Sequence, residues 1–210
     1  MSVTQRNRWL MIGSGILFVV FSALVRIPAV TDAEGKVLLA IHSMTTKGFE
    51  RAMLNLNAIG GPKPIYAFAM CLAAYWLQKR RPDLTAFVVV GCGLSGGLNL
   101  ALRAAFHRHR PELWHTLIYD HSFVWSFPSG HSCLVATISS AVLIPMAASR
   151  TKTIATAIAC AYCFVVAATT LVLGVHYPID ILAGWLSGWI VIYATWLAIT
   201  LKSKHVETEP

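Results

Sequence analysis

Three short patterns of ionisable and small polar residues stand out in this chain of 210 residues. One is a pair of arginines seven positions apart, and another is a serine, a glycine and a histidine in succession. The third is a histidine followed four positions later by an aspartate. Side chains of these types bind anions, donate protons and attack electrophiles, so together they could form a reactive site. In chain order the patterns are Arg103 with Arg110-Pro111, Pro128-Ser129-Gly130-His131, and His176 with Asp180.

The first two patterns have the chemistry of a phosphate site. Arg103 and Arg110 would share one face if a helix continues between them, and two guanidiniums can then hold phosphate oxygens through charge-assisted hydrogen bonds. Ser129 is a typical N-cap residue, and Gly130 allows a ligand to approach the backbone closely. A helix that begins there offers free N–H groups to an anion.

The histidines add acid–base and nucleophilic chemistry. His176 is a possible nucleophile, Asp180 can fix its tautomer, and His131 can protonate a leaving alkoxide. Three simpler roles stay open at this point. Asp180 could only complement the charge of a helix start, His131 could be an interfacial histidine, and Arg110 could be a snorkelling anchor.

The composition identifies the kind of fold that must position these residues. Hydrophobic residues make up 56% of the chain and charged residues only 12%, against roughly 25% charged in an average soluble domain. This excludes a soluble globule and a disordered chain. The five cysteines are odd in number and sit in apolar runs, which argues against a disulfide-stapled secreted domain. We therefore expect one integral membrane domain over residues 1–210.

Six apolar stretches have, or nearly have, the length of about 20 residues that crosses a bilayer as a helix. They predict an all-α fold, a bundle of six transmembrane helices. The stretches are Trp9–Val25, Pro64–Leu77, Leu84–Leu102, Cys133–Ala148, Ile154–Val175 and Ile181–Leu201.

The net charge of +8 has two interpretations, a positive-inside bias of cytoplasmic loops and a basic site for an anion. Six spans put four basic clusters and both termini on the cytoplasmic face, and the three patterns on the outer face. These clusters are Arg6 with Arg8, Lys79-Arg80-Arg81, Arg150 with Lys152, and Lys202 with Lys204. Further ionisable residues expected on the outer face include His107, Arg108, His109, His115, Asp120 and His121.

Other segments favour structural roles. Within residues 26–63, the apolar spacing of Val37, Leu38, Ile41 and Met44 predicts an amphipathic helix at the membrane interface. We expect it to be a lid or packing element rather than a substrate gate. The small residues of Gly91–Gly97 favour close helix packing over a phosphate loop. Cys160-Ala-Tyr-Cys163 has metal-like spacing but no acid or histidine nearby, so we predict structural cysteines and no metal site.

The chain resembles the membrane members of the type 2 phosphatidic acid phosphatase family, which shares its site with vanadium haloperoxidases. The resemblance covers residues 86–199, and its strongest stretches are Phe106–Trp114, Ser126–Ser132 and Leu173–Gly188. It implies hydrolysis of a phosphate monoester or diphosphate through a phosphohistidine, with neither a metal nor another cofactor.

Carried over by position, the resemblance assigns a role to each matching residue. It makes His176 the nucleophile, Asp180 its partner and His131 the acid that protonates the leaving group. It places the transferring phosphoryl group against Ser129, the Gly130 amide and Arg110. These donors would stabilise a trigonal-bipyramidal phosphoryl group.

The chain departs from the family pattern in two places, one of them a single residue and the other a pair. Arg103 stands where the family has lysine, which keeps the charge and changes its shape. Thr169 and Thr170 stand where the family has Ser-Arg, so one phosphate-binding cation is missing. Ser149-Arg150 cannot replace it, because the fifth span carries this pair to the cytoplasmic face. A residue among His107, Arg108 and His109 could supply the charge instead.

The sequence thus predicts a lipid phosphatase of a bacterial inner membrane that acts on a lipid phosphate or diphosphate at the outer leaflet. Its expected partners are the lipid substrate and the bilayer, with no nucleic acid. Two alternatives stay open. The same site could pass the phosphoryl group to the hydroxyl of another lipid, or it could bind or transport a phospholipid without catalysis.

Overall fold

The structure is a computed structural model that describes the backbone of residues 3–114 and 125–206 and the side chains of residues 9–114 and 125–201. His115, Asp120 and His121 lie outside the described residues, as do the side chains of Arg6, Arg8, Lys202 and Lys204. The described part is all-helical, with one isolated bridge between His109 and Trp125. Its helices are α1 (Val3–Leu24), α2 (Pro28–Ser43), α3 (Lys47–Ile59), α4 (Pro62–Gln78), α5 (Pro82–Phe106), α6 (Gly130–Leu143), α7 (Arg150–Val172) and α8 (Pro178–Val206).

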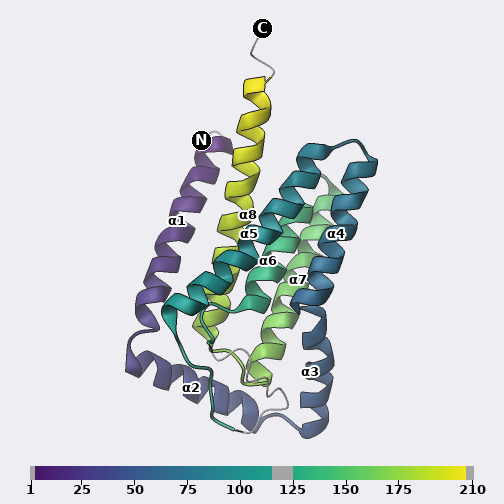
Figure 1. Cartoon of the computed structure of the whole chain (residues 1–210). Helices are drawn as coiled ribbons and strands as arrows, with labels where there is room; N and C mark the ends of the chain where they lie inside the picture. Colours follow the sequence, from purple (N-terminus) through teal and green to yellow (C-terminus); the bar gives the residue numbers. More distant parts are fainter. Residues whose placement is uncertain (1–2, 115–124, 207–210) are drawn as a thin grey trace.

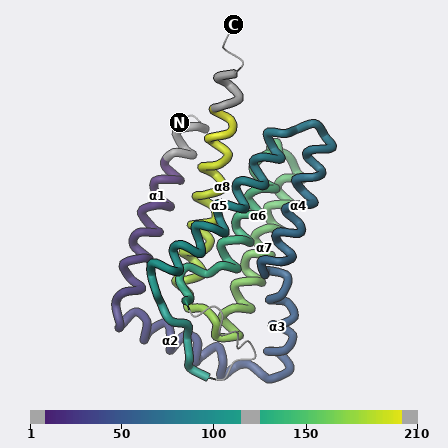
Figure 2. The backbone as a smooth tube through the Cα atoms, viewed as in Figure 1, coloured from purple at the N-terminus to yellow at the C-terminus, as the bar shows by residue number. Residues whose placement is uncertain are grey.

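The long helices form a bundle whose two ends differ (Figure 1). The α4–α5 link lies at the same end as the start of α1 and the end of α8. At the other end, α2 runs across the bundle, and the starts of α6 and α8 lie near it. The tube in Figure 2 follows this path, with α2 leading into α3 and α4 along one edge. The crossing helix therefore stands beside the three patterns.

The expectation of an all-α membrane protein is confirmed. Three helices are long and apolar enough to cross a membrane, namely Pro82–Phe106, Arg150–Val172 and Pro178–Leu201. Trp9–Leu24 and Pro28–Ser43 pass the same test as a pair bent by 93°. The other two predicted spans fall on α6 and α4, whose 14 and 17 residues are fewer than the roughly 20 that cross a bilayer. The count of six spans stays a prediction.

Helix α8 packs closely on α6 at two of its glycines, where any side chain would collide with α6. A Cβ on Gly184 would lie 2.6 Å from the carbonyl oxygen of Ser129 and 2.8 Å from Cβ of Ser132. A Cβ on Gly188 would collide with the carbonyl of Cys133. This small-xxx-small spacing lets two helix backbones approach each other. It fixes the start of α6 against the start of α8.

The glycine-rich run of α5 also serves packing, as predicted. A Cβ on Gly91 would collide with Ile192 of α8, and one on Gly96 with the hydroxyl of Tyr66 of α4. Gly93 and Gly97 have nothing within 4 Å of an added Cβ. Two of these glycines therefore let neighbouring helices pack closely.

The segment over residues 26–63 holds two helices rather than one. The predicted amphipathic helix is α2, which buries Leu38 and leaves Val37 exposed and Met44 exposed just past its end. The sequence analysis did not identify α3, which begins at Thr46, whose side chain accepts a hydrogen bond from the amide of Phe49. Both helices contribute side chains to the site.

Candidate active site

The fold brings the three sequence patterns together at the end of the bundle that α2 crosses. The amide of Ser129 donates to the carbonyl of Asp180 at 2.9 Å, which joins the second pattern to the third. An added Cβ on Gly130 would lie 3.7 Å from Nη1 of Arg103. Arg110 donates from Nη1 to the carbonyl of Val175 at 3.1 Å. Residues as far apart in the sequence as Arg103 and Asp180, 77 positions, therefore surround one region.

His176 and Asp180 form a buried pair at the start of α8. His176 is 1% exposed and Asp180 is 0% exposed. Nδ1 of His176 lies 3.7 Å from Oδ2 of Asp180, longer than a hydrogen bond. Catalytic contacts of this kind often tighten only when substrate binds. Burial lowers the pKa of His176 to about 3, with Asp180 opposing this shift and Arg110 and Arg103 adding to it. The imidazole is therefore neutral at physiological pH.

Asp180 is held on both carboxylate oxygens. Oδ1 accepts from Nη1 of Arg108 at 2.6 Å, and Oδ2 accepts from the amide of Tyr177 at 2.9 Å. The guanidinium of Arg108 stacks over the Tyr177 ring, 4.2 Å from its centroid. Burial opposes the charge on Arg108, but the carboxylates of Asp180 and Glu34 outweigh it and raise its pKa. Asp180 thus has a permanently cationic partner.

Glu34 of α2 completes this cluster and was missed by sequence analysis. Its Oε2 accepts from Nη2 of Arg108 at 2.5 Å, and its Oε1 accepts from the amide of Ile179 at 2.7 Å. It is 6% exposed. The signal that could have found it is its place on the buried face of the amphipathic helix, four residues before Leu38. A charged residue on such a face needs a partner.

Ser129 caps α6, as expected of its residue type. Its hydroxyl accepts from the amide of Ser132 at 3.4 Å, and its side chain is fully buried. Asn99 of α5, a buried residue that sequence analysis also missed, donates to the carbonyl of Pro128 at 3.2 Å. The backbone that begins α6 is therefore fixed from both α5 and α8.

His131 is positioned by a side chain from α3. Nε2 of His131 lies 3.4 Å from Nδ2 of Asn57. Oδ1 of Asn57 accepts from the hydroxyl of Thr169 at 2.9 Å. Asn57 is 6% exposed and was not singled out from the sequence. Thr169, which stands where the family has serine, is therefore linked through Asn57 to His131, the candidate acid.

Arg103 and Arg110 act on both histidines, although α5 does not continue between them. The helix ends at Phe106, and His107 follows with a left-handed φ of 50°. The condition for a shared helical face is therefore not met, because α5 ends before Arg110. Arg103 donates from Nε to the carbonyl of Trp125 at 2.8 Å. Charges of both arginines nevertheless interact with His131 and His176.

Each of the three candidates for the missing cation has a contact with another side chain in the described part of the chain. Arg108 is bound to Glu34 and Asp180. His107 and His109 pack edge-on against the Trp125 ring, with centroids 4.6 and 5.0 Å away. Thr170 is fully buried and its hydroxyl donates to the carbonyl of Ala167. A hydroxyl that binds within α7 thus stands where the family has a cation, and its replacement by one of these three residues stays a prediction.

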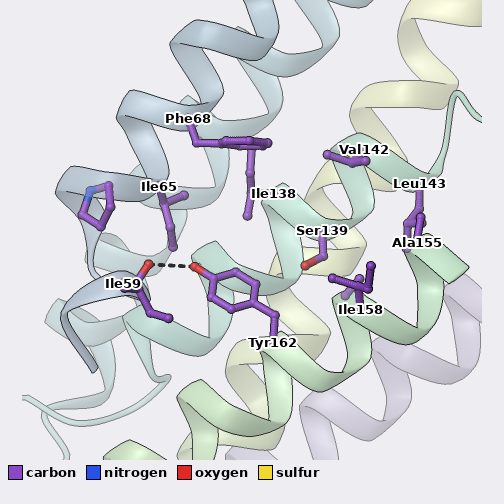
Figure 3. Close-up of a pocket in the computed structure, with 12 residues that line it drawn as sticks. Ile59, Ile65, Phe68, Ile138, Ser139, Val142, Leu143, Ala155, Ile158 and Tyr162 are labelled. Atoms are coloured by element: carbon purple, nitrogen blue, oxygen red, sulfur yellow. Dashed lines mark hydrogen bonds between the residues drawn. The ribbon is translucent and has the colours of Figure 1, made fainter. Parts of the chain in front are cut away.

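An apolar cleft of about 500 Å³ lies between α4 and α7, and residues of α6 also line it. Figure 3 shows its lining, in which Ser139 and the hydroxyl of Tyr162 are the polar groups among those labelled. That hydroxyl donates to the carbonyl of Ile59 at 2.7 Å. Two residues beyond Ile59, an added Cβ on Gly61 would lie 3.8 Å from Nε2 of His131. One end of the cleft is thus close to the candidate acid.

The cysteines and potential metal ligands form no further site in the described ranges. The five thiols are free, and no group of three histidine, cysteine or acidic side chains is placed to hold a metal ion there. Cys160 is exposed, and Cys163 lies 3.9 Å from the hydroxyl of Ser139. The structural role predicted for this pair stays a prediction.

Comparison with known proteins gives a consistent family and fold. A family model described as the PAP2 superfamily matches residues 84–204, more than half of the chain. No curated protein matches the chain. The crystal structure of the first transmembrane PAP2 type phosphatidylglycerolphosphate phosphatase from Bacillus subtilis is 20% identical, with a TM-score of 0.79 over 95% of this chain and 97% of that chain. That of Aquifex aeolicus LpxE is 20% identical, with a TM-score of 0.59 over 76% and 92%.

Proposed function

The chain belongs to the PAP2 superfamily, and from this premise we propose that it is an integral membrane phosphatase for a lipid phosphate monoester or diphosphate. The observation that carries the proposal is the buried pair of His176 and Asp180 against the start of α6, with two arginine charges acting on the imidazole. This arrangement combines a nucleophile, a proton donor and an anion site.

His176 would attack the phosphorus through Nε2, because Nδ1 faces Asp180. As the N–P bond forms, the bond from phosphorus to the leaving oxygen breaks, and His131 gives that oxygen a proton. A water then attacks the phosphohistidine while His131 takes up a proton from it. Inorganic phosphate leaves, and His176 is restored. Asp180 accepts a hydrogen bond from Nδ1–H throughout, without taking the proton, and stabilises the positive charge that develops on the ring.

The phosphoryl oxygens would be held by the start of α6 and by the two arginines. The Ser129 hydroxyl and the Gly130 amide lie at the helix N-terminus, where the helix dipole favours an anion. Arg103 and Arg110 supply positive charge that acts on both histidines. Phosphoryl transfer depends mainly on such positioning and charge stabilisation.

We extend the proposal to the topology. Residues 1–210 would form one domain with its motif-bearing core at 86–199, and six helices would cross the membrane with both termini in the cytoplasm. The basic α4–α5 link then lies at the cytoplasmic end, following the positive-inside rule. The site would face the outer leaflet.

A lipid substrate is supported by the apolar cleft between α4 and α7. One end of the cleft lies close to His131, and its lining follows α6 from Ile138 to Leu143. Ile138 lies seven positions after His131, a distance of about 10 Å along the helix axis. An acyl or isoprenoid chain in the cleft would therefore leave its phosphate at the site.

The decisive experiment measures phosphate release from purified protein with a panel of lipid phosphates and diphosphates in mixed micelles. The panel includes phosphatidate, phosphatidylglycerophosphate and a polyprenyl diphosphate. We expect His176→Ala to lose at least about a thousandfold in kcat, because the nucleophile is gone. Undiminished release from this variant would refute the role of His176.

A second candidate, a lipid-binding protein without catalysis, is favoured by Thr169 and Thr170 at the positions of the family's Ser-Arg. The same assay separates the candidates. A wild-type protein that binds the lipids but releases phosphate no faster than His176→Ala would establish the binder. A labelled donor lipid offered with an acceptor lipid would reveal transfer instead of hydrolysis.

A further inference from the structure

We propose that Glu34 of α2 is a positioning residue for the reaction, acting on His176 through Arg108 and Asp180. Glu34 lies outside residues 84–204, the part of the chain that the family model covers. The proposal rests on the hydrolytic function proposed for His176. It assigns to the crossing helix a part in catalysis that neither the sequence patterns nor the family match indicates.

The contacts join three charged side chains in a row and end beside the ring of His176. Glu34 binds Nη2 of Arg108 at 2.5 Å, and Nη1 of the same guanidinium binds Oδ1 of Asp180 at 2.6 Å. Oδ2 of Asp180 faces Nδ1 of His176 at 3.7 Å. The guanidinium is also held by the hydroxyl of Thr31 at 3.2 Å and by the Tyr177 ring. Every charged member is less than a tenth exposed.

Glu34 affects Asp180 because both carboxylates bind the guanidinium of Arg108 and share its positive charge. The two carboxylates and one guanidinium carry one net negative charge beside His176. This charge stabilises the ring when it becomes cationic or carries a phosphoryl group on Nε2 and a proton on Nδ1. Without the charge of Glu34, Arg108 would be balanced by Asp180 alone. Asp180 would then be a weaker acceptor for Nδ1.

Glu34 also has a structural contact, which the test must separate from its charge. Oε1 accepts from the amide of Ile179 in the first turn of α8, so the carboxylate satisfies a free N–H at that helix start. Glu34→Gln keeps the length and an acceptor oxygen for Ile179, but it removes the charge and the second acceptor oxygen, which binds Arg108. Asp32→Asn is the matched control, because Asp32 is an exposed acid on the same helix.

The first measurement is the steady-state kinetics of phosphate release. We expect Glu34→Gln to lower kcat about tenfold, the scale typical of groups that orient a functional histidine, and to leave KM within about twofold. Asp32→Asn should match the wild type in both. An unchanged kcat in Glu34→Gln would overturn the proposal, and so would a higher KM with the same kcat, because that result would place Glu34 in substrate binding.

The second measurement reads the His176 tautomer and does not depend on turnover. In protein labelled with ¹⁵N-histidine, the nitrogen shifts of His176, assigned by their loss in His176→Gln, should show the proton on Nδ1. Glu34→Gln should move a substantial part of the population to the other tautomer, and Asp32→Asn should not. If the wild type releases no phosphate, the proposed function fails while this readout still decides the role of Glu34. An unaltered tautomer in Glu34→Gln overturns it.

A double variant tests whether charge balance is the cause. Arg108→Met leaves the carboxylates of Glu34 and Asp180 without their cation, a severe cost for buried charges. Adding Glu34→Gln restores the wild-type net charge of the cluster. We expect Glu34→Gln/Arg108→Met to regain at least about fivefold in kcat over Arg108→Met, or to yield folded protein where Arg108→Met does not. A double variant worse than both single variants would rule out charge balance.

Discussion

The helix pairs α6–α8 and α4–α7 flank the same site, and they differ in what lies between them. The first pair is joined through Gly184 and Gly188, with no room for an added methyl group. The second pair stands apart over α6 and leaves the apolar cleft of about 500 Å³. A backbone contact that excludes even a Cβ holds its residues more firmly than a gap that side chains only line.

This difference follows the demands that the proposed reaction makes on each side. The α6–α8 contact carries Ser129, His131, His176 and Asp180, whose mutual distances must be kept within about 0.5 Å. The α4–α7 side carries none of these groups, and its link to them runs from Thr169 of α7 through Asn57 to His131. A lipid phosphatase needs both properties, a fixed site for the phosphoryl group and an adaptable space for chains.

Among tests of this contrast, the largest effect is expected from Gly184→Ala, which forces the tight contact apart. The added Cβ would meet the carbonyl of Ser129 at 2.6 Å, and a backbone atom cannot turn aside as a side chain can. The start of α6 must therefore move away from His176. A displacement of about 1 Å costs on the order of a hundredfold in rate. The measurement is kcat/KM for phosphate release, together with the apparent melting temperature in detergent.

Gly93→Ala is the matched control, because Gly93 lies in transmembrane helix α5 with nothing within 4 Å of an added Cβ. It should keep the wild-type rate and melting temperature. Equal rates for the two alanine variants would contradict the view that the α6–α8 contact sets the geometry of the site.

A smaller effect is expected from filling the open side with Ala155→Trp. Ala155 lines the cleft, as Figure 3 shows, and an indole there would occupy space proposed for a lipid chain. We expect KM for a long-chain lipid phosphate to rise about tenfold, as for the loss of one to two methylene contacts. The kcat for a short-chain, water-soluble phosphate ester should not change. Kinetics with both substrates would separate tail binding from chemistry.

Ala157→Trp controls for the bulk of the new side chain, since Ala157 is exposed on the same helix and does not line the cleft. Its kinetics should equal those of the wild type with either substrate. If both tryptophan variants raise KM alike, the cleft is not where the chain binds.

Much of this fold could be predicted from the sequence, because its signals are long and repeated. Each of the six apolar stretches coincides over most of its length with one helix of the structure. The N-cap at Ser129 and the prolines that begin α5 and α8 also mark helix starts locally. Helix α3 was missed although Thr46 caps its start as Ser129 caps that of α6, because its 13 residues are too short and too polar for a predicted span.

The site could be predicted only where residues of a known chemistry lie close together in the sequence. His176 and Asp180 are four positions apart, whereas Arg108 meets Glu34 across 74 positions and Thr169 meets Asn57 across 112. Contacts of this range depend on how α2 and α3 fold back on the bundle, which no local pattern specifies. The turn at His107 was missed for a related reason, because nothing in the arginine spacing indicates where α5 ends.

A further expected effect is a pH dependence of stability, which reports how completely the tight side excludes water from His176. Burial lowers the pKa of His176 to about 3 in the folded protein, whereas an unfolded histidine titrates near 6.5. The folded protein therefore keeps a neutral ring where the unfolded chain binds a proton. The stability contributed by this difference is fully present above pH 6.5 and is lost as the pH falls toward 3. Between pH 7 and pH 5 the loss is on the order of 2 kcal/mol.

The variant His176→Gln cannot bind this proton, so its apparent melting temperature should fall less than that of the wild type between pH 7 and pH 5. Other titrating groups act on both proteins alike, and the difference between the two slopes isolates His176. Identical slopes would mean that water reaches the imidazole in the folded state. The α6–α8 contact would then be no drier than the cleft on the other side, and the contrast between the two helix pairs would be one of spacing alone.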